Sequence, residues 1–394
     1  MRIRVTREVE IPDLRKLERY RRTPELGPSI LFFSGGTALR DTSRALISHT
    51  HNSIHLITPF DSGGSSAILR QAFGMPAVGD IRNRLMALAD QSLQGNPAIF
   101  DLFAHRLSKK AAQPQLREEL DSMASGKHPL VRHIPDPMRK IIRNHFHQFL
   151  DWMPEDFNLK GASIGNLVLT GGYLSNRRQM DPVIFLFSKL VPVCGVVRPT
   201  INKDLHLAVR LEDGQVIVGQ HLITGKETPP LASPIKEAWL TASLDSAEPV
   251  RPVIRRKITE RISEADLICY PPGSFFSSVI ANLLPDGVGK AVARNTCPKV
   301  FVPNTSHDPE TRGMSVTAQV DMLCRYLASS GAPTDSDVLG FVLVDTKSGR
   351  YPGGLDRKEL EDRGLTVINA QLVTKESAPY IDAHRLSSIL LSLS

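Results

Sequence analysis

The run ITPFDSGGSSAILRQAFGMPAVGDIRNRLMALAD, residues 57–90, leads from an apolar segment into a Gly/Ser turn and then through two helical patterns. Asp61 opens the turn, and Asp80 and Arg82 open the second helical pattern. Glycine turns that lead into helices present backbone N–H groups, which bind phosphate. Small residues, carboxylates and arginines within this short distance therefore predict a polyphosphate site rather than a hydrophobic core.

Two interpretations are open for the acidic residues of this run. Asp61 can ligate Mg²⁺, which favours one or two carboxylates together with phosphate oxygens, or Asp61 or Ser62 can cap the following helix. Asp80 either adds to the same metal site or caps its own helix. Arg82 indicates a ligand more directly, because a cation in the first helical turn opposes the helix dipole at a cost of up to about 1 kcal/mol, which a bound anion reverses. Asn83 beside it can hydrogen-bond a sugar or a base.

A similar unit precedes this run. Residues 29–33 (SILFF) are apolar after Ser29, as in a central parallel strand, and lead through Gly35, Gly36 and Thr37 into a helical pattern over 38–48. Two interpretations are open for this loop: it is a second candidate phosphate site, or its glycines serve only a tight strand-to-helix turn. Neither the GxGxxG fingerprint of dinucleotide-binding proteins nor the phosphate loop that ends in Lys-Ser/Thr is present, which argues against NAD, FAD and an ordinary ATPase.

Apolar runs alternate with helical patterns along the rest of the chain. Strands are expected near 53–58, 266–269, 299–302 and 338–344, and a hairpin over 205–219. The alternation predicts an α/β protein with a three-layer α/β/α, Rossmann-like fold, a mainly parallel sheet and a helical insertion. Because ligands bind at the carboxyl ends of such strands, the turns after them should lie together.

The expected organisation has three parts. Residues 1–28 form a lead-in strand and helix, residues 29–345 form the main domain, and residues 346–394 form a C-terminal appendage packed on the same domain. Residues 96–160, rich in charge and histidine, form the helical insertion. His145 and His147 point to different faces of a helix, which argues against a metal site there.

Composition limits the class of protein. The chain has 394 residues, 41% hydrophobic and 23% charged, as in a globular protein. No run approaches the roughly 18 to 20 apolar residues of a membrane span, and the charged N-terminus lacks a signal peptide, so we expect a cytoplasmic protein with no membrane partner. A net charge of +7 is modest, and no zinc-finger spacing or aromatic-interleaved basic stripe indicates nucleic acid. The four widely spaced cysteines are expected to be buried free thiols.

Six short motifs in the same order identify a resemblance to the CofD-like family, which includes 2-phospho-L-lactate transferase and the YvcK-type gluconeogenesis factors. The pattern is closest to the YvcK type. The family motifs GGTGL, DDGGSSG, PPGDIRN, SxGN, ADLIxxGPGSLYTS and a late strand-Asn element are met by residues 35–39, 61–67, 77–83, 163–166, 265–278 and 302–304.

The resemblance implies one of two activities. The transferase branch moves a phospholactyl-type group, with Mg²⁺, from a nucleotide diphosphate conjugate to a deazaflavin alcohol and releases a nucleoside monophosphate. The YvcK branch binds a UDP-sugar as a regulatory protein with no assigned reaction. The long insertion also fits a CofD-like branch found beside an ATP-grasp enzyme. A homodimer is usual in the family.

The resemblance also assigns the site, with a GDP- or UDP-linked ligand. Asp61, Asp80 and Arg82 are the expected catalytic residues, with Asp61 and Asp80 holding Mg²⁺. The family pattern gives least guidance on the pocket wall, which we expect to involve Phe275, Phe276 and the insertion. The expected nucleotide- and phosphate-binding residues are Gly35, Gly36, Thr37, Gly63, Gly64, Ser65, Asn83, Gly165, Asn166, Gly273, Ser274 and Asn304.

Two departures from the family pattern bear on the site. The second aspartate of the DD pair is Ser62, and the last glycine of GGTGL is Ala38. Losing one carboxylate weakens metal-assisted chemistry, although Asp80 can supply a ligand from the neighbouring loop. Catalyst and sensor therefore both stay open.

Overall fold

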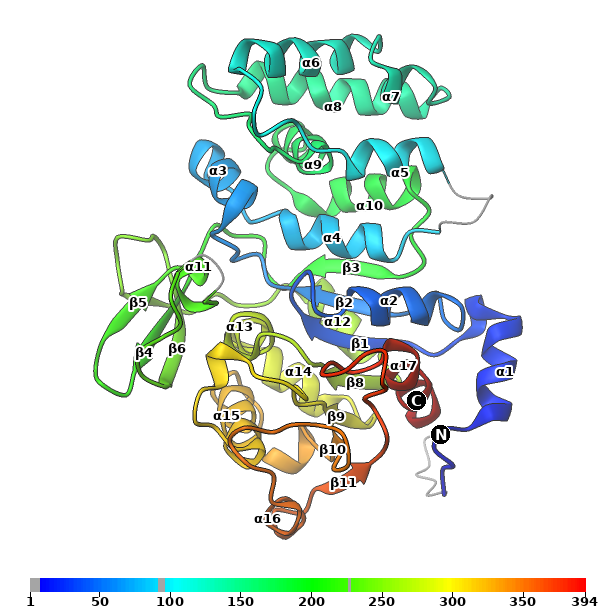
Figure 1. Cartoon of the computed structure of the whole chain (residues 1–394), viewed down its shortest axis with the longest axis vertical. Coiled ribbons are helices and arrows are strands. Elements are labelled where there is room, and N and C mark those ends of the chain that lie inside the picture. The colour runs from blue at the N-terminus through cyan, green and yellow to red at the C-terminus, as the bar shows by residue number, and fades with distance from the viewer. Residues whose placement is uncertain (1–7, 91–95, 226–227) are drawn as a thin grey trace.

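The computed structural model describes residues 8–90, 96–225 and 228–394. Figure 1 shows a central sheet covered by helices, a separate group of helices above it and a small second sheet to one side. The expected lead-in strand falls largely on residues 1–7, outside the described part. The expected helix after it is present as α1, Leu14–Arg22.

The main sheet, which the sequence predicts to be mainly parallel, is parallel throughout the described residues. Among the described residues it has seven strands in the order β11-β10-β9-β8-β1-β2-β3. The strands β1, β2 and β8 are buried along their whole length, because helices cover both faces of the sheet. The strand bounds are Ile30–Ser34 (β1), Ile54–Ile57 (β2), Val196–Pro199 (β3), Leu267–Tyr270 (β8), Lys299–Phe301 (β9), Phe341–Val344 (β10) and Thr366–Asn369 (β11).

Alternate side chains of β1 belong to two different cores, as the period of two in a strand requires. Leu31 and Phe33 pack into the core beneath α12, α14 and α15, whereas Ile30 and Phe32 pack into the core beneath α2 and α17. The sheet is therefore the middle of three layers, which confirms the predicted fold class. The helix bounds are Arg40–Ile47 (α2), Arg256–Ser263 (α12), Val288–Arg294 (α14), Val316–Ser329 (α15), Arg357–Asp362 (α16) and Ala383–Leu393 (α17).

The C-terminal segment is built into the main sheet. Strand β11 pairs in parallel with β10 and extends the sheet by one strand. Helix α17 packs against α2 and α1, and the Asp13 N–H donates to Ser392 Oγ at 2.9 Å. The two described ends of the chain consequently lie close together (Figure 1).

The helical insertion lies between β2 and β3 and has its own apolar core. Helices α3 and α4 join it to the sheet, and the predicted helices after residue 96 are confirmed. The helical group continues past residue 160 through α9 and α10 before β3. The bounds are Gly64–Phe73 (α3), Gly79–Ala87 (α4), Pro97–Ala104 (α5), Gln113–Ser125 (α6), Pro129–Arg132 (α7), Met138–Trp152 (α8), Ile164–Ser175 (α9) and Met180–Leu190 (α10).

The small second sheet is antiparallel, with the order β5-β4-β6-β7. The predicted hairpin is formed by β4, His206–Leu211, and β5, Val216–Val218. The strands β6, Ile235–Thr241, and β7, Pro249–Val250, complete it. A short helix, α11 (Gln220–Ile223), follows β5 and leads back toward the main sheet. A π-helix, Phe275–Ile280, and α13, Ala281–Leu283, follow β8.

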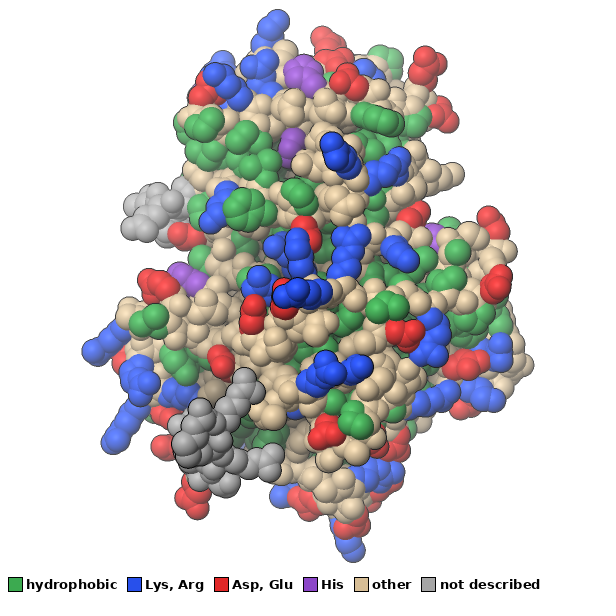
Figure 2. Space-filling view, turned by 180° about the vertical axis from the view of Figure 1, so that it is seen from behind, with side chains coloured by type: hydrophobic (Ala, Val, Ile, Leu, Met, Phe, Trp, Pro, Cys, Tyr) green, Lys and Arg blue, Asp and Glu red, His purple; other side chains and the backbone are tan. Residues whose placement is uncertain are grey.

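The surface charge is locally compensated on α12. Figure 2 shows Lys and Arg side chains across the middle of one face of the molecule, with acidic side chains among them. The α12 cations Arg256, Lys257 and Arg261 pair with Glu260, Asp181 and Glu264 at 2.7, 3.3 and 2.6 Å. Within the described residues, no helix is long and apolar enough to cross a membrane.

The cysteines are all free thiols, as expected, but they are not all buried. Cys269 and Cys324 lie in the core, whereas Cys194 and Cys297 are partly exposed. Desolvation raises the pKa of both Cys194 and Cys297 to about 11, so these thiols stay protonated at neutral pH.

Candidate functional site

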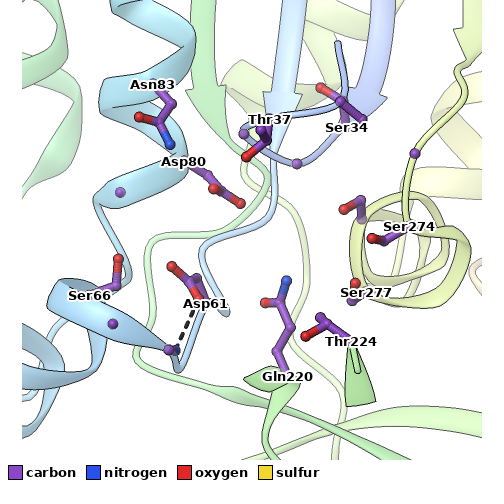
Figure 3. A pocket seen from close by; sticks show the side chains of 18 of the residues that line it. Ser34, Thr37, Asp61, Ser66, Asp80, Asn83, Gln220, Thr224, Ser274 and Ser277 are labelled. Carbon is purple, nitrogen blue, oxygen red and sulfur yellow. Dashed lines mark hydrogen bonds between the residues drawn. The ribbon is translucent and has the colours of Figure 1, made fainter. Parts of the chain in front are cut away.

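A cavity of about 460 Å³ lies at the carboxyl ends of β1, β2 and β8, where an open parallel sheet binds its ligands. The insertion and α11 close it on the other sides. Figure 3 shows Asp61, Asp80 and Gln220 directed into this space from different elements. Most of the predicted residues line it: Gly35, Gly36, Thr37, Asp61, Gly63, Gly64, Ser65, Asp80, Arg82, Asn83, Asn166, Gly273 and Ser274.

The first glycine turn follows β1 and is packed too closely for any side chain. A Cβ at Gly35 would lie 2.5 Å from Ser278 Oγ, and a Cβ at Gly36 would lie 2.9 Å from the Cα of Asp80. The start of α4 therefore rests directly against this turn. Glycine is required at position 36 because the backbone of Asp80 occupies the space of a side chain, whereas at Gly35 the Ser278 side chain occupies it.

Arg84 holds the same turn from beneath, and sequence reasoning did not find it. Its guanidinium donates to the carbonyl oxygens of Gly35 and Leu39, each at 2.8 Å, and its side chain is fully buried. Burial lowers the pKa of Arg84 to about 10, so it stays charged at neutral pH. A fixed cation thus lies under the turn that was predicted to bind phosphate.

The second turn follows β2 and is shaped by Asp61. Asp61 Oδ1 accepts the N–H of Gly63 at 3.0 Å, while Oδ2 lies near Gly79. The N-cap of α3 is Gly63 and that of α4 is Val78, and neither helix has a side-chain cap bond among the described residues. The capping interpretation of Asp61 and Asp80 is therefore wrong, and both carboxylates face the cavity.

Arg70 fixes the backbone around Asp61. Its guanidinium donates to the carbonyl oxygens of Phe60 at 2.9 Å and Asp61 at 3.2 Å, and it pairs with Asp204 at 2.6 Å. Only 4% of the Arg70 side chain is exposed. The ion pair joins the Asp61 turn to the segment that enters the small sheet.

Ser62 replaces a family carboxylate and makes a different contact. Its Oγ lies 2.8 Å from His221 Nδ1 and accepts the His221 N–H at 3.2 Å. These bonds hold α11 at the edge of the cavity, where Gln220, His221 and Thr224 line it. Sequence reasoning missed these residues, because no local motif marks a helix that belongs to a distant hairpin.

Gln220 is the most informative of the missed residues. Its side chain points into the cavity (Figure 3), and only 7% of it is exposed. Its Oε1 has no hydrogen-bond partner among the described residues. A buried acceptor without a partner is costly, and a ligand O–H or N–H would satisfy it.

The third turn, after β8, is already occupied by acidic side chains. Asp308 accepts the N–H of Phe275 at 2.9 Å, and Glu310 accepts those of Phe276 and Ser277, each at 2.8 Å. Burial, and then the neighbouring Asp308 carboxylate, raise the pKa of Glu310 to about 8. These backbone donors are therefore engaged within the protein, and the turn offers chiefly Ser274 and Ser278 to the cavity.

Two predicted binding residues, Asn304 and Gly165, do not line the cavity but contact residues that do. Asn304 accepts the Gly273 N–H at 2.8 Å and donates to the Gly273 carbonyl at 2.7 Å, so it braces the third turn. Gly165 lies under Arg82, and a Cβ there would be 2.8 Å from Arg82 Cδ. The expected wall role of Phe275 and Phe276 is wrong, because both rings are buried in the core.

The insertion does contribute to the wall, through Arg106 and Lys109 in the segment between α5 and α6. Together with Arg82 these residues make that side of the cavity cationic. Arg82 is 8% exposed, and burial, and then Arg106, lower the pKa of Arg82 to about 10. Asn166 of α9 donates to Ser65 Oγ at 3.1 Å and ties α9 to the second turn.

The carboxylates of the cavity fit a cation that takes most of its ligands from a bound phosphate and from water. Asp61 and Asp80 are two carboxylates facing one cavity, which suits Mg²⁺ completed by phosphate oxygens and water. Among residues 8–90, 96–225 and 228–394, no group of three or more His, Cys, Asp or Glu side chains could hold a metal ion without such help. His145 is buried, and desolvation lowers its pKa.

A parallel α/β/α sheet with a polar cavity at its strand ends defines the class: a Rossmann-like protein with a helical insertion. Within that class, the chain belongs to the CofD family, because the family model described as 2-phospho-L-lactate transferase CofD matches residues 30–373.

Relatives from several bacteria support this assignment. The chain is similar to the gluconeogenesis factor of Bacillus subtilis, with 29% identity over 93% of this chain and 98% of that protein. It is 28% identical to a putative gluconeogenesis factor of Thermoanaerobacterium thermosulfurigenes, over 93% of this chain and 97% of that protein. The crystal structure of a UPF0052 family protein from Bacillus halodurans shares the fold, with a TM-score of 0.67, 24% identity and coverage of 92% of this chain and 99% of that one.

Proposed function

We propose that the cavity binds a nucleotide diphosphate conjugate and that the protein transfers a phospho-linked group from it to an alcohol. The observation that carries this proposal is the convergence of two glycine turns with Asp61, Asp80 and Arg82 on one cavity. Backbone N–H groups of the turns at Gly35 and Gly63 would bind the diphosphate. The buried cation of Arg84 adds positive potential beneath the first turn.

In the proposed reaction the alcohol oxygen attacks the distal phosphorus, and the bond from that phosphorus to the bridging oxygen breaks. The nucleoside monophosphate leaves with the bonding electron pair, and the proton of the alcohol passes to a carboxylate of the cavity. Arg82 would neutralise charge that develops on the leaving phosphate. Positioning and electrostatics carry such a reaction, so no nucleophilic side chain is required.

Asp61 and Asp80 would hold Mg²⁺ in this scheme. The ion would supply charge neutralisation on the phosphate oxygens. The protein's own part is to fix both carboxylates. Arg70 holds the backbone of Asp61, and the close packing of Gly36 holds the backbone of Asp80. These contacts orient both groups before any ligand binds.

A second candidate is a regulatory protein that binds a UDP-sugar without turning it over. The contact of Ser62 with His221 favours the regulatory candidate. Ser62 stands where the family has its second carboxylate, and in this protein it contacts α11 instead of offering a metal ligand. The relatives named gluconeogenesis factor also fit a regulatory role. The same glycine turns and Arg82 would bind the ligand in this case.

Two measurements separate the candidates. Thermal unfolding is followed with GDP, UDP and UDP-sugars, each with and without Mg²⁺, and phosphorus NMR follows release of the monophosphate from the conjugate that binds. A bound ligand raises stability by about 2.7 kcal/mol at one hundred times its Kd. Metal-dependent stabilisation with monophosphate release supports the transferase. Metal-independent stabilisation by one intact UDP-sugar supports the regulator, and no shift with any nucleotide removes both.

Asp61→Asn tests the metal role, with Asp151→Asn as its control. Asp151 is an exposed aspartate at the end of α8, far in the sequence from the turns and outside the lining of the cavity. Asp61→Asn should lose the effect of Mg²⁺, and Asp151→Asn should keep it. Full turnover by Asp61→Asn would exclude a metal-binding role for this carboxylate.

A further inference from the structure

Ser62 and His221 contact each other at the edge of the cavity, and their hydrogen bonds indicate which ring nitrogen of His221 carries a proton. Ser62 Oγ lies 2.8 Å from His221 Nδ1 and accepts the backbone N–H of His221 at 3.2 Å. Among the described residues the Ser62 side chain makes no other hydrogen bond, and Ser62 is only 7% exposed. The hydroxyl hydrogen of Ser62 therefore has one acceptor in the described protein, which is His221 Nδ1.

A hydrogen bond donated by Ser62 requires that Nδ1 carries no proton of its own. A neutral imidazole has a single proton, which then lies on Nε2. In the opposite arrangement Nδ1–H would donate to Ser62, and the Ser62 hydroxyl hydrogen would have no acceptor in a nearly buried position, which is costly. The geometry thus favours neutral His221 with its proton on Nε2.

The imidazole ring is also held in place by the glycine that precedes α11. Gly219 has φ +111°, and a Cβ there would lie 2.9 Å from His221 Cε1 and 3.1 Å from Nδ1. The ring thus lies against the backbone along the edge that contains Nδ1 and Cε1. Nε2 makes no hydrogen bond to another described residue, although His221 is half-buried and lines the cavity. Nε2–H is therefore the hydrogen-bond donor that the ring retains for a ligand.

The preceding residue of α11 adds an acceptor to this donor. Gln220 is directed into the same cavity (Figure 3), and its buried Oε1 has no partner among the described residues. A phosphate oxygen would suit the donor of His221 but would oppose Oε1, since both are acceptors. A sugar hydroxyl, or the adjacent N–H and C=O groups of a nucleobase, offers a donor and an acceptor together. Consecutive side chains of α11 therefore match an uncharged part of a ligand.

We propose that Ser62 fixes the proton of His221 on Nε2, and that this N–H donates to an oxygen of the uncharged part of the ligand, beside Gln220 Oε1. Ser62 is then a positioning residue, and His221 is a specificity-determining residue. The ligand contact rests on the proposed function, since it assumes that the glycine turns bind the diphosphate. The position of the proton in the free protein does not depend on that assumption.

The proton position is measured in the free protein at neutral pH, by long-range proton–nitrogen correlation NMR of isotope-labelled protein. The His221 ring is assigned by its absence from His221→Asn. We expect an unprotonated Nδ1 and a protonated Nε2. Ser62→Asp should place a proton on Nδ1, because an ionised carboxylate only accepts hydrogen bonds. Ser62→Thr keeps the hydroxyl and should keep the wild-type pattern. A protonated Nδ1 in the wild type, or an unaltered pattern in Ser62→Asp, would overturn the proposal.

The ligand contact is measured by titration calorimetry with UDP, GDP and UDP-glucose. His221→Asn keeps a polar atom near the position of Nδ1 but has none at the position of Nε2, so it should bind the ligand about tenfold more weakly. His221→Gln places an amide N–H near the position of Nε2 and should recover most of this loss. The matched control is His147→Asn, because His147 is an exposed histidine of α8 that does not line the cavity.

The ligands distinguish the two sources of the oxygen. A loss of affinity with UDP or GDP assigns the contact to the nucleoside, and a loss with UDP-glucose alone assigns it to the sugar. Equal affinity of His221→Asn and the wild type for every ligand that binds would overturn the ligand contact. Absence of binding by every nucleotide would instead overturn the proposed function and the ligand contact with it, while the NMR spectra still decide the role of Ser62.

Discussion

Replacing Gly36 by alanine tests how closely α4 rests against the first glycine turn. The new Cβ would lie 2.7 Å from Asp80 Cγ and 2.9 Å from Asp80 Cα. The Cα belongs to the backbone of the first turn of α4, so it cannot swing aside as a flexible side chain would. Overpacking of this kind costs about 1–3 kcal/mol. Part of that cost is offset by about 0.4–1 kcal/mol, because alanine restricts the unfolded chain more than glycine does.

We therefore expect Gly36→Ala to lower the free energy of unfolding by about 1–2 kcal/mol, measured by urea denaturation. The control is Gly340→Ala, where the nearest atom to a new Cβ is Lys299 O at 4.0 Å and no positive φ is involved. This variant should stay within about 0.5 kcal/mol of the wild type. Gly36→Ala should also weaken binding of the nucleoside diphosphate by moving Asp80. Equal stability and equal affinity for Gly36→Ala and the wild type would refute the close packing.

Three further predictions concern residues around the cavity. Gln220→Ala should weaken binding of the conjugate about tenfold in calorimetry if its unpaired Oε1 accepts a ligand hydrogen; unchanged affinity would contradict this role. Arg70→Met leaves Asp204 without its buried partner and should lower the free energy of unfolding, measured by urea denaturation, by about 2 kcal/mol. An unchanged free energy of unfolding would mean that the ion pair does not stabilise the protein. The pKa of Glu310 in the folded protein, about 8, lies above its value in the unfolded chain. The free energy of unfolding should therefore fall as pH rises from about 4.5 and level off above 8. Glu310→Gln should flatten this pH profile, and an unaltered profile would contradict the raised pKa of Glu310.

The fold could be predicted because its strands carry a strong local signal. The run SILFF at 29–33 is apolar from Ile30 to Phe33, and a strand buried on both faces needs this composition. The parallel arrangement also brought the turns after β1 and β2 together, so the proximity of Gly36, Asp61 and Asp80 followed from topology. These parts of the site were predictable from short-range patterns and one rule of sheet geometry.

The remaining parts depend on contacts between distant segments. Gln220 and His221 reach the cavity because Ser62 holds α11 from 159 residues away, a contact that no local pattern encodes. The turn after β8 looked equivalent to the first two, yet Asp308 and Glu310 occupy its backbone donors. Asp308 and Glu310 lie in the loop after β9, where no sequence pattern indicates the direction of their side chains.

The proposed function depends most directly on whether the cavity binds a nucleotide diphosphate through the two glycine turns and the facing carboxylates. Calorimetric titration of GDP and of UDP into the wild-type protein, with and without Mg²⁺, tests this claim. We predict that one of them binds and that Mg²⁺ tightens its binding through Asp61 and Asp80. Titrations that show no heat of binding and no metal dependence for either nucleotide, even at millimolar concentration, would contradict it.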